Sequence, residues 1–436
     1  MENALPRYDS ARISPRLLYR VGLAAYLYCL AIELWHTATV LHTDYVQTAA
    51  YHAASWNVSN YFVSYSGGFV RRGLPGAAFS LFATPNKSSA FTMFWVLTAL
   101  SYAGVLGSAF VITRVVARSR YRPFVWLIVL ISPFALNALA ASKDNAYLGR
   151  YDAISAVSML ALVFVGRRVS HPVVAVAAMT LLVSVATLSE EFTFAFMVPV
   201  LLACAYRVTI APRDGLTQRR LDRYGIRLLA IPLVSGAIFA LWSLVARVPQ
   251  STIDRAQKAV GGNKDSFDAA SALNMSLSEE RRFINAFGLW NVNFSIGMWC
   301  ILFLTICAAL SYLIQTQRRW YWASAAYCAV VACAISQFGI DFRRWWLLAL
   351  TAQLATAALL WPAEAGEAAK SSRRVEWVRR LLVAAVLVGC VSFQLNPGVF
   401  HPYQLATSTY WKGTAAYWVP GHHGIGCFLH LSSSQC

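Results

Sequence analysis

Charged side chains are scarce in this chain, and acidic ones are the scarcest. Asp, Glu, Lys and Arg make up 13% of the 436 residues, whereas an ordinary soluble domain has about a quarter. That shortage excludes a typical soluble globular domain. Apolar residues make up 58% of the chain instead, and such a composition predicts a protein that crosses a membrane many times.

Long apolar runs recur along almost the whole chain. Since a transmembrane helix needs about 20 mostly apolar residues, we predict an all-α, polytopic fold with about eleven such helices. The first run follows a basic N-terminus and ends without a small-residue cleavage site, so we expect a signal anchor there. The predicted spans are 17–36, 91–113, 123–141, 153–166, 171–188, 192–209, 228–246, 294–314, 321–338, 346–361 and 381–396.

The basic residues are distributed unevenly between the two sides of this predicted topology. With the N-terminus in the cytoplasm, most of the 37 Lys and Arg residues fall in cytoplasmic segments, and most of the 19 Asp and Glu residues fall outside. This is the charge bias that orients membrane proteins. The net charge of +18 is therefore mainly a topology signal, and since the basic residues lie in scattered patches beside spans, no nucleic-acid role is expected.

The spans indicate one membrane domain, residues 1–396, with two long outer loops at 37–90 and 247–293. An odd number of spans places the C-terminal tail, residues 397–436, outside the cytoplasm. We therefore expect a multi-pass protein of a bacterial inner membrane, N-terminus in and C-terminus out, with its active face extracytoplasmic. No repeat is visible, and no cytoplasmic loop is long enough to form a domain.

The first outer loop contains the sequence YSGGFVRRGLPG. Gly67 and Gly68 permit backbone conformations and close approaches that a side chain would block, and Arg71 and Arg72 follow directly. Arginine is a planar fork of donors that binds phosphate through two points. The pair is a candidate clamp for a phosphate or pyrophosphate group, and an anchor for ordinary lipid headgroups is the alternative.

Three further outer turns carry charge. The turn SKDNAYLGRYDA contains two acids and two bases, which can pair with each other, or the two acids can bind a divalent cation. SEEF places two carboxylates at a span end, where one can act as an acid with a raised pKa or both can lie in water. GIDFRRWW adds an acid and two arginines. The charged residues of these turns are Lys143, Asp144, Arg150, Asp152, Glu190, Glu191, Asp341, Arg343 and Arg344.

Acids and arginines in separate outer turns suggest one shared polar pocket on the outer face, open to the lipid. The second outer loop supports a site at this interface. Its segment SLSEERRFINAFGLW has Ser276 or Ser278 as a candidate helix cap and an apolar face, so we expect a helix lying on the membrane. The polar stretch before it, STIDRAQKAVGGNKDSFDAA, is expected to be a mobile loop.

The layout resembles the GT-C-type glycosyltransferases, polytopic enzymes that use polyprenyl-phosphate-linked sugars. GGFVRRGLPG, GRYD and DFRRW are also similar to a group of poorly characterised bacterial membrane proteins associated with cell-surface polysaccharide synthesis. By this resemblance Asp44 is the catalytic base, and Asp144 or Asp152 is the second acid, which assists donor phosphate or metal binding. The chain departs from the better-known members in lacking a large soluble C-terminal domain.

The resulting hypothesis is a membrane glycosyltransferase. Its partners are a polyprenyl-linked sugar donor, a glycan or glycolipid acceptor and the lipid bilayer. Arg71, Arg72 and Arg343 or Arg344 would stabilise the leaving phosphate, so no metal is strictly required. Two alternatives stay open: a polysaccharide polymerase that takes a lipid-linked oligosaccharide, and a lipid-linked glycan flippase or other transporter. A transporter would need polar residues deep within the spans, and these spans are nearly free of charge.

Overall fold

The computed structural model is helical throughout the part of the chain that it describes. Described are residues 20, 24, 60–82, 96, 151–169, 171–209, 223–259, 273–276, 278–279, 281–282, 289–314, 317–337, 342–361, 377 and 381–382. Within these residues there is no β-strand, which confirms the predicted all-α class.

The long helices coincide with seven of the predicted spans. They are α7 (Asp152–Arg168), α8 (Pro172–Ser189), α9 (Thr193–Thr209), α10 (Arg223–Val245), α14 (Leu289–Ile314), α15 (Arg318–Ser336) and α16 (Phe342–Leu360). The spans predicted at 17–36, 91–113, 123–141 and 381–396 lie almost wholly outside the described residues, so the count of eleven stays a prediction.

Within the described residues, α8 is the helix that is by itself both long enough and apolar enough to cross a membrane. A second candidate is the pair Ala230–Val245 and Gln250–Ala256, which passes only jointly and is bent by 88° at its break. The apolar stretches of α9, α14 and α16 are shorter, at 10–17 residues each.

Helix ends in this region follow ordinary local chemistry. Asp152 lies in the first turn of α7, and Arg167 and Arg168 lie in its last turn, as the helix dipole favours. Pro172 begins α8, where its missing N–H is not needed. Glu190 then takes an extended backbone (φ −156°, ψ 105°) and ends α8, so α9 returns in the opposite direction after a short turn.

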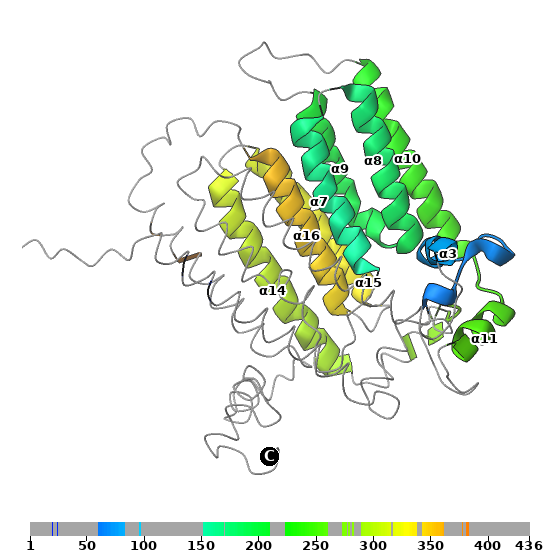
Figure 1. Cartoon of the computed structure of the whole chain (residues 1–436). Helices are drawn as coiled ribbons and strands as arrows, with labels where there is room; N and C mark the ends of the chain where they lie inside the picture. The colour runs from blue at the N-terminus through cyan, green and yellow to red at the C-terminus, as the bar shows by residue number, and fades with distance from the viewer. Residues whose placement is uncertain are drawn as a thin grey trace, which may run out of the picture.

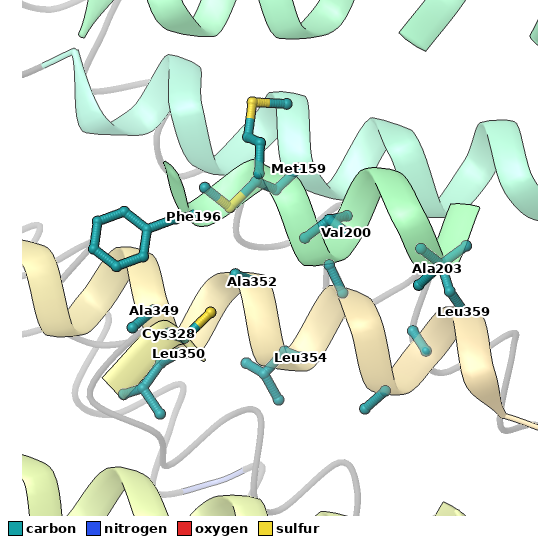
Figure 2. Close-up of a cluster of buried hydrophobic side chains, with 14 of the residues drawn as sticks. Met159, Phe196, Val200, Ala203, Cys328, Ala349, Leu350, Ala352, Leu354 and Leu359 are labelled. Carbon is teal, nitrogen blue, oxygen red and sulfur yellow. The ribbon is translucent and has the colours of Figure 1, made fainter. Parts of the chain in front are cut away.

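Helix α16 is the centre of the bundle. It packs against α7, α9, α14 and α15, while α8 packs against α7, α9 and α10 (Figure 1). Every residue from 348 to 361 is buried. Figure 2 shows this core, with Met159 of α7 and Phe196, Val200 and Ala203 of α9 facing the apolar side chains of α16.

Arg167 joins the C-terminal end of α7 to the C-terminal end of α16. Its Nε atom donates to the carbonyl oxygen of Ala358 over 3.1 Å, and its Nη2 atom donates to that of Trp361 over 2.6 Å. The last carbonyls of a helix have no partner within the helix. Arg167 therefore caps the C-terminal end of α16 with a positive charge, which the helix dipole also favours.

Short helices lie at the other end of the bundle. The turns η2 (Asn60–Phe62) and η3 (Tyr65–Gly67) lead into α3 (Gly73–Phe82), and α11 (Gln250–Ala259) packs against η2 (Figure 1). The prediction of a mobile loop was wrong for residues 251–259, because Thr252, Ile253 and Ala256 form a buried stripe on α11.

The predicted helix cap in the second outer loop is confirmed. The backbone N–H of Ser276 donates to Glu279 Oε2 over 2.7 Å, and the N–H of Glu279 donates back to Ser276 Oγ over 3.3 Å. This reciprocal arrangement is a capping box. The residues expected to form the apolar face of that helix lie outside the described residues.

The distribution of basic residues predicts which helix ends face the cytoplasm. A phosphatase reporter that is active only outside the cytoplasm should be inactive when fused after residue 171 and active after residue 249. The reason is that Arg167 and Arg168 precede the first fusion point and hold it inside. Phosphatase assays on the two fusions check this, and the reverse pattern would contradict the assigned orientation.

Candidate functional site: a buried cluster of ion pairs

The glycine-rich motif is folded by close backbone contacts. Gly68 has φ of 115°, a conformation that side chains disfavour. At Gly76 a Cβ atom would overlap the carbonyl oxygen of Val63, because α3 packs directly against the backbone of the preceding turn. Glycine is therefore needed at both positions to fold residues 60–82 into one compact cap.

Arg72 has a left-handed backbone, with φ of 56°. For a residue with a side chain this conformation is unfavourable by roughly 1–2 kcal/mol. Strain of this kind persists only where surrounding contacts over-determine it. At Arg72 those contacts are made by its guanidinium group, which the turn before α3 directs toward the junction of α8 and α9.

Glu190 and Glu191 form that junction, and both are buried. Their side chains have 0% exposure. The prediction left open that these carboxylates lie in water, and that alternative was wrong. A buried carboxylate is costly unless it is paired and hydrogen-bonded, so the partners of these two residues determine whether the fold is tenable.

Glu191 is held by both arginines of the motif. Arg71 donates from Nε to Glu191 Oε1 over 2.6 Å, and its Nη2 atom also contacts this oxygen. Arg72 donates from Nε to Glu191 Oε2 over 3.1 Å and from Nη2 to Oε1 over 3.0 Å. Arg71 Nη1 donates in addition to the carbonyl oxygen of Leu273 over 3.3 Å. Both oxygens of Glu191 are thus satisfied by charged donors.

Glu190 extends the pairing to α16 and α7. Its Oε1 atom accepts from Arg72 Nη2 over 2.7 Å, and its Oε2 atom accepts from Arg344 Nη2. Arg344 also donates from Nε to Asp152 Oδ1 over 2.6 Å. The six side chains alternate in sign, in the order Arg71, Glu191, Arg72, Glu190, Arg344, Asp152, and we call them the charge cluster.

Aromatic rings enclose the cluster on several sides. The guanidinium carbon of Arg344 lies 4.7 Å from the ring centre of Trp345, which packs edge-on against Phe192. Tyr61 of the cap packs edge-on against Tyr151, with 5.1 Å between ring centres. Low polarity around these pairs strengthens each ionic hydrogen bond and raises the penalty for losing one.

The two glutamates respond to this setting in opposite ways. Burial raises the pKa of Glu190, and the attraction of Arg344 and Arg72 opposes this rise without cancelling it. Burial would also raise the pKa of Glu191, but Arg71 and Arg72 together outweigh it and hold that pKa well below its usual range. The two adjacent carboxyl groups thus have pKa values shifted in opposite directions by the same burial and different arginine contacts.

Of the site residues predicted from sequence, the structure brings together Arg71, Arg72, Asp152, Glu190, Glu191 and Arg344. Gly67 and Gly68 belong to the adjoining loop. Arg343 lies in α16, and its side chain is not among those described. Asp44, Lys143, Asp144, Arg150 and Asp341 lie outside the described residues.

Sequence reasoning missed which residues pair with which. It predicted a phosphate group as the ligand of Arg71 and Arg72 and named no partners for Glu190 and Glu191, whereas the structure pairs the motif with those glutamates. The sequence carries no signal for this pairing, because the same turns contain further acids and bases, such as Lys143, Asp144 and Arg150, that could pair equally well. Within the described residues, no three His, Cys, Asp or Glu side chains are grouped as metal ligands.

Residues 26–247, about half of the chain, match a known protein family. The family is described as "Uncharacterised membrane protein Rv1490". The chain belongs to this family. It is thus a membrane protein, and the matched region holds all members of the charge cluster except Arg344. Neither the curated proteins nor the solved structures contain a match.

Replacing Glu191 with Gln should destabilise the fold strongly. The substitution keeps the side-chain shape but leaves two buried guanidinium groups without their main acceptor. Removing one partner of a buried ion pair lowers the free energy of unfolding by about 3–5 kcal/mol. Thermal unfolding of the purified protein in detergent measures this, with Asp254→Asn on the exposed face of α11 as the matched control. Equal unfolding temperatures for both variants would contradict the pairing.

The stability of the protein should also depend on Glu190 in a defined direction. A carboxyl group whose pKa is raised by folding binds its proton more tightly in the folded state. Its contribution to stability is therefore full below the ordinary glutamate pKa and is lost as the pH rises through the raised value. Unfolding temperatures of the wild type and Glu190→Gln across this pH window should show that the variant lacks this decline. If the unfolding temperatures of the wild type and Glu190→Gln depend on pH in the same way, the raised pKa of Glu190 is contradicted.

Proposed function

We propose that this protein is an integral membrane glycosyltransferase of the bacterial inner membrane. It would take a sugar from a polyprenyl-phosphate or pyrophosphate donor at the extracytoplasmic face, for cell-surface polysaccharide or glycolipid synthesis. The observation that supports this most is the convergence of the cap, the start of α7, the α8–α9 turn and the start of α16 on one charge cluster. The substrate class rests on the resemblance of the layout to GT-C-type enzymes.

The position of the buried charges favours an enzyme over a transporter. The fully buried charged residues of the described part are Glu190, Glu191 and Arg344, and all three belong to the cluster at one end of the bundle. A transport path would place such residues along the depth of the spans. The core between α7, α9 and α16 is mostly apolar (Figure 2), and the buried polar side chains of α7 and α16 outside the cluster, such as Ser158, Thr351 and Gln353, carry no charge.

The cluster keeps some capacity to bind a phosphate group. Each guanidinium has five N–H donors, and no side chain or carbonyl of the described residues accepts from Arg72 Nη1. With all six groups ionised, three positive charges balance three negative charges. Protonation of Glu190 would leave one net positive charge, and this charge would attract an anionic phosphate.

The reaction that follows is a direct displacement. Asp44 takes the proton of an acceptor hydroxyl, whose oxygen forms a bond to the anomeric carbon of the donor sugar. The bond from that carbon to the phosphate oxygen breaks, and the polyprenyl phosphate leaves with the electron pair. Arg71 and Arg72 stabilise the charge that develops on it. A polymerase would use the same steps with a lipid-linked oligosaccharide as donor.

One observation favours the transporter as a second candidate. The joint α10–α11 segment is bent by 88° at its break, and broken helices form the substrate sites of many transporters. Here the break is fixed by Asn274, whose side chain exchanges two hydrogen bonds with the backbone of Val248, at 2.9 and 2.7 Å. Such a fixed corner suits a static wall of a site better than a moving one.

The proposed activity predicts which lipid-linked species accumulate in cells. Mass spectrometry of lipid-linked glycans should show a polyprenyl-linked sugar or oligosaccharide that builds up without the protein and clears when the wild type is restored. Asp44→Asn should fail to clear it at a normal protein level, because the acceptor hydroxyl keeps its proton. Asp254→Asn serves as the control.

The size of the accumulating species separates a single-sugar transferase from a polymerase. Loss of a transporter would also make a lipid-linked glycan accumulate, but on the cytoplasmic side, so labelling of the glycan from outside intact spheroplasts separates the two functions. Clearance by Asp44→Asn at the wild-type rate would remove the assigned base. If no species accumulates in cells lacking the protein, the glycosyltransferase proposal is wrong.

A further inference from the structure

Asp152 differs from the other two carboxylates of the charge cluster in its exposure. Its side chain is 23% exposed, whereas those of Glu190 and Glu191 are 0% exposed. Among the acids of the cluster, Asp152 is therefore the one that a molecule outside the protein can contact. It is also the last member of the alternating series, so a contact there disturbs the fewest internal pairs.

The geometry leaves one oxygen of Asp152 available. Its Oδ1 atom accepts from Arg344 Nε over 2.6 Å, and no donor of the described residues bonds to Oδ2. Asp152 is also the first residue of α7, where the helix dipole favours a negative charge. The orientation of the side chain is thus fixed through one oxygen, while the second can accept a hydrogen bond.

Arg344 is itself held in place on two sides. Its Nη2 atom bonds to Glu190, which is bonded in turn to Arg72, and its guanidinium lies against the ring of Trp345. Holding Asp152 and Glu190 at once requires a planar fork with separate donors, which arginine has and lysine lacks. The buried part of the cluster therefore fixes the position of Asp152 in advance of any ligand.

We propose that Asp152 is a substrate-binding carboxylate that accepts a hydrogen bond from a sugar hydroxyl, and that Arg344 and Glu190 are its positioning residues. This proposal rests on the function proposed above. A carboxylate oxygen accepts hydrogen bonds and donates none, so its ligand must donate. A sugar hydroxyl is such a donor, and the substrates of the proposed reaction carry several of them.

The test compares Asp152→Asn with the wild type in the lipid-linked glycan assay. Hydrogen bonds to charged groups contribute about 1.5–3 kcal/mol, so Asp152→Asn should slow clearance of the accumulating species by about tenfold or more. The unfolding temperature of the purified variant should fall less than that of Glu191→Gln, because Asp152 is 23% exposed and the amide oxygen of an asparagine there can still accept from Arg344 Nε. Asp254→Asn should match the wild type in both measurements.

Asp152→Glu provides a second variant that keeps the ion pair with Arg344. It moves the carboxylate by one methylene group, so it should fold normally and still clear the lipid-linked species slowly. Wild-type clearance by this variant and by Asp152→Asn, in an assay where cells lacking the protein accumulate the species, overturns the role of Asp152 and leaves the glycosyltransferase proposal intact. Absence of any accumulating species overturns both.

The positioning role is tested by combining substitutions. Arg344→Lys alone should slow clearance, and Arg344→Lys with Asp152→Asn should be no slower than Asp152→Asn alone, since both changes act on one contact. A purely structural Arg344 would instead multiply the two effects on clearance, because the two substitutions would then act independently. That multiplicative result would overturn the assignment of Arg344.

Discussion

The fold of the described region depends on one constraint, which is that two adjacent buried carboxylates must find positive partners. Glu190 and Glu191 lie between α8 and α9 with no access to solvent, and neither helix supplies a cation there. The partners come from far away in sequence, from the cap before α3 and from the start of α16. The pairing therefore fixes how three distant parts of the chain sit together.

This constraint also accounts for the unusual backbone of the motif. Gly68 and Gly76 let residues 60–82 fold back closely on themselves, and the left-handed backbone of Arg72 directs its side chain into the cluster. The ionic contacts of Arg72 offset its local strain. Internal ion pairing thus explains why Arg71 and Arg72 lie in the glycine-rich motif. Binding of a phosphate would use only the guanidinium N–H groups that this pairing leaves without an acceptor.

The sequence predicted the helices well and the contacts poorly. The boundaries of α7, α8 and α9 follow from apolar length, Pro172 and the terminal charges, all of which act locally. Glu190 and Glu191 were recognised as noteworthy, but their partners lie about 120 residues before and 150 residues after them. Pairing at such separation depends on how helices pack. The helix at 250–259 was missed because its buried stripe is short and surrounded by polar residues.

The central position of α16 has a consequence for the order in which the protein assembles. The chain is made from its N-terminus, so Asp152 and Glu190 enter the membrane long before Arg344 is synthesised. Until α16 arrives, the groove between α7 and α9 is unfilled and Glu190 lacks one of its two cationic partners. The core, the capping of the last carbonyls of α16 by Arg167 and the charge cluster all require α16, so none of them can be complete before it is in place. The last of the described core helices to be made is thus the one that completes the site.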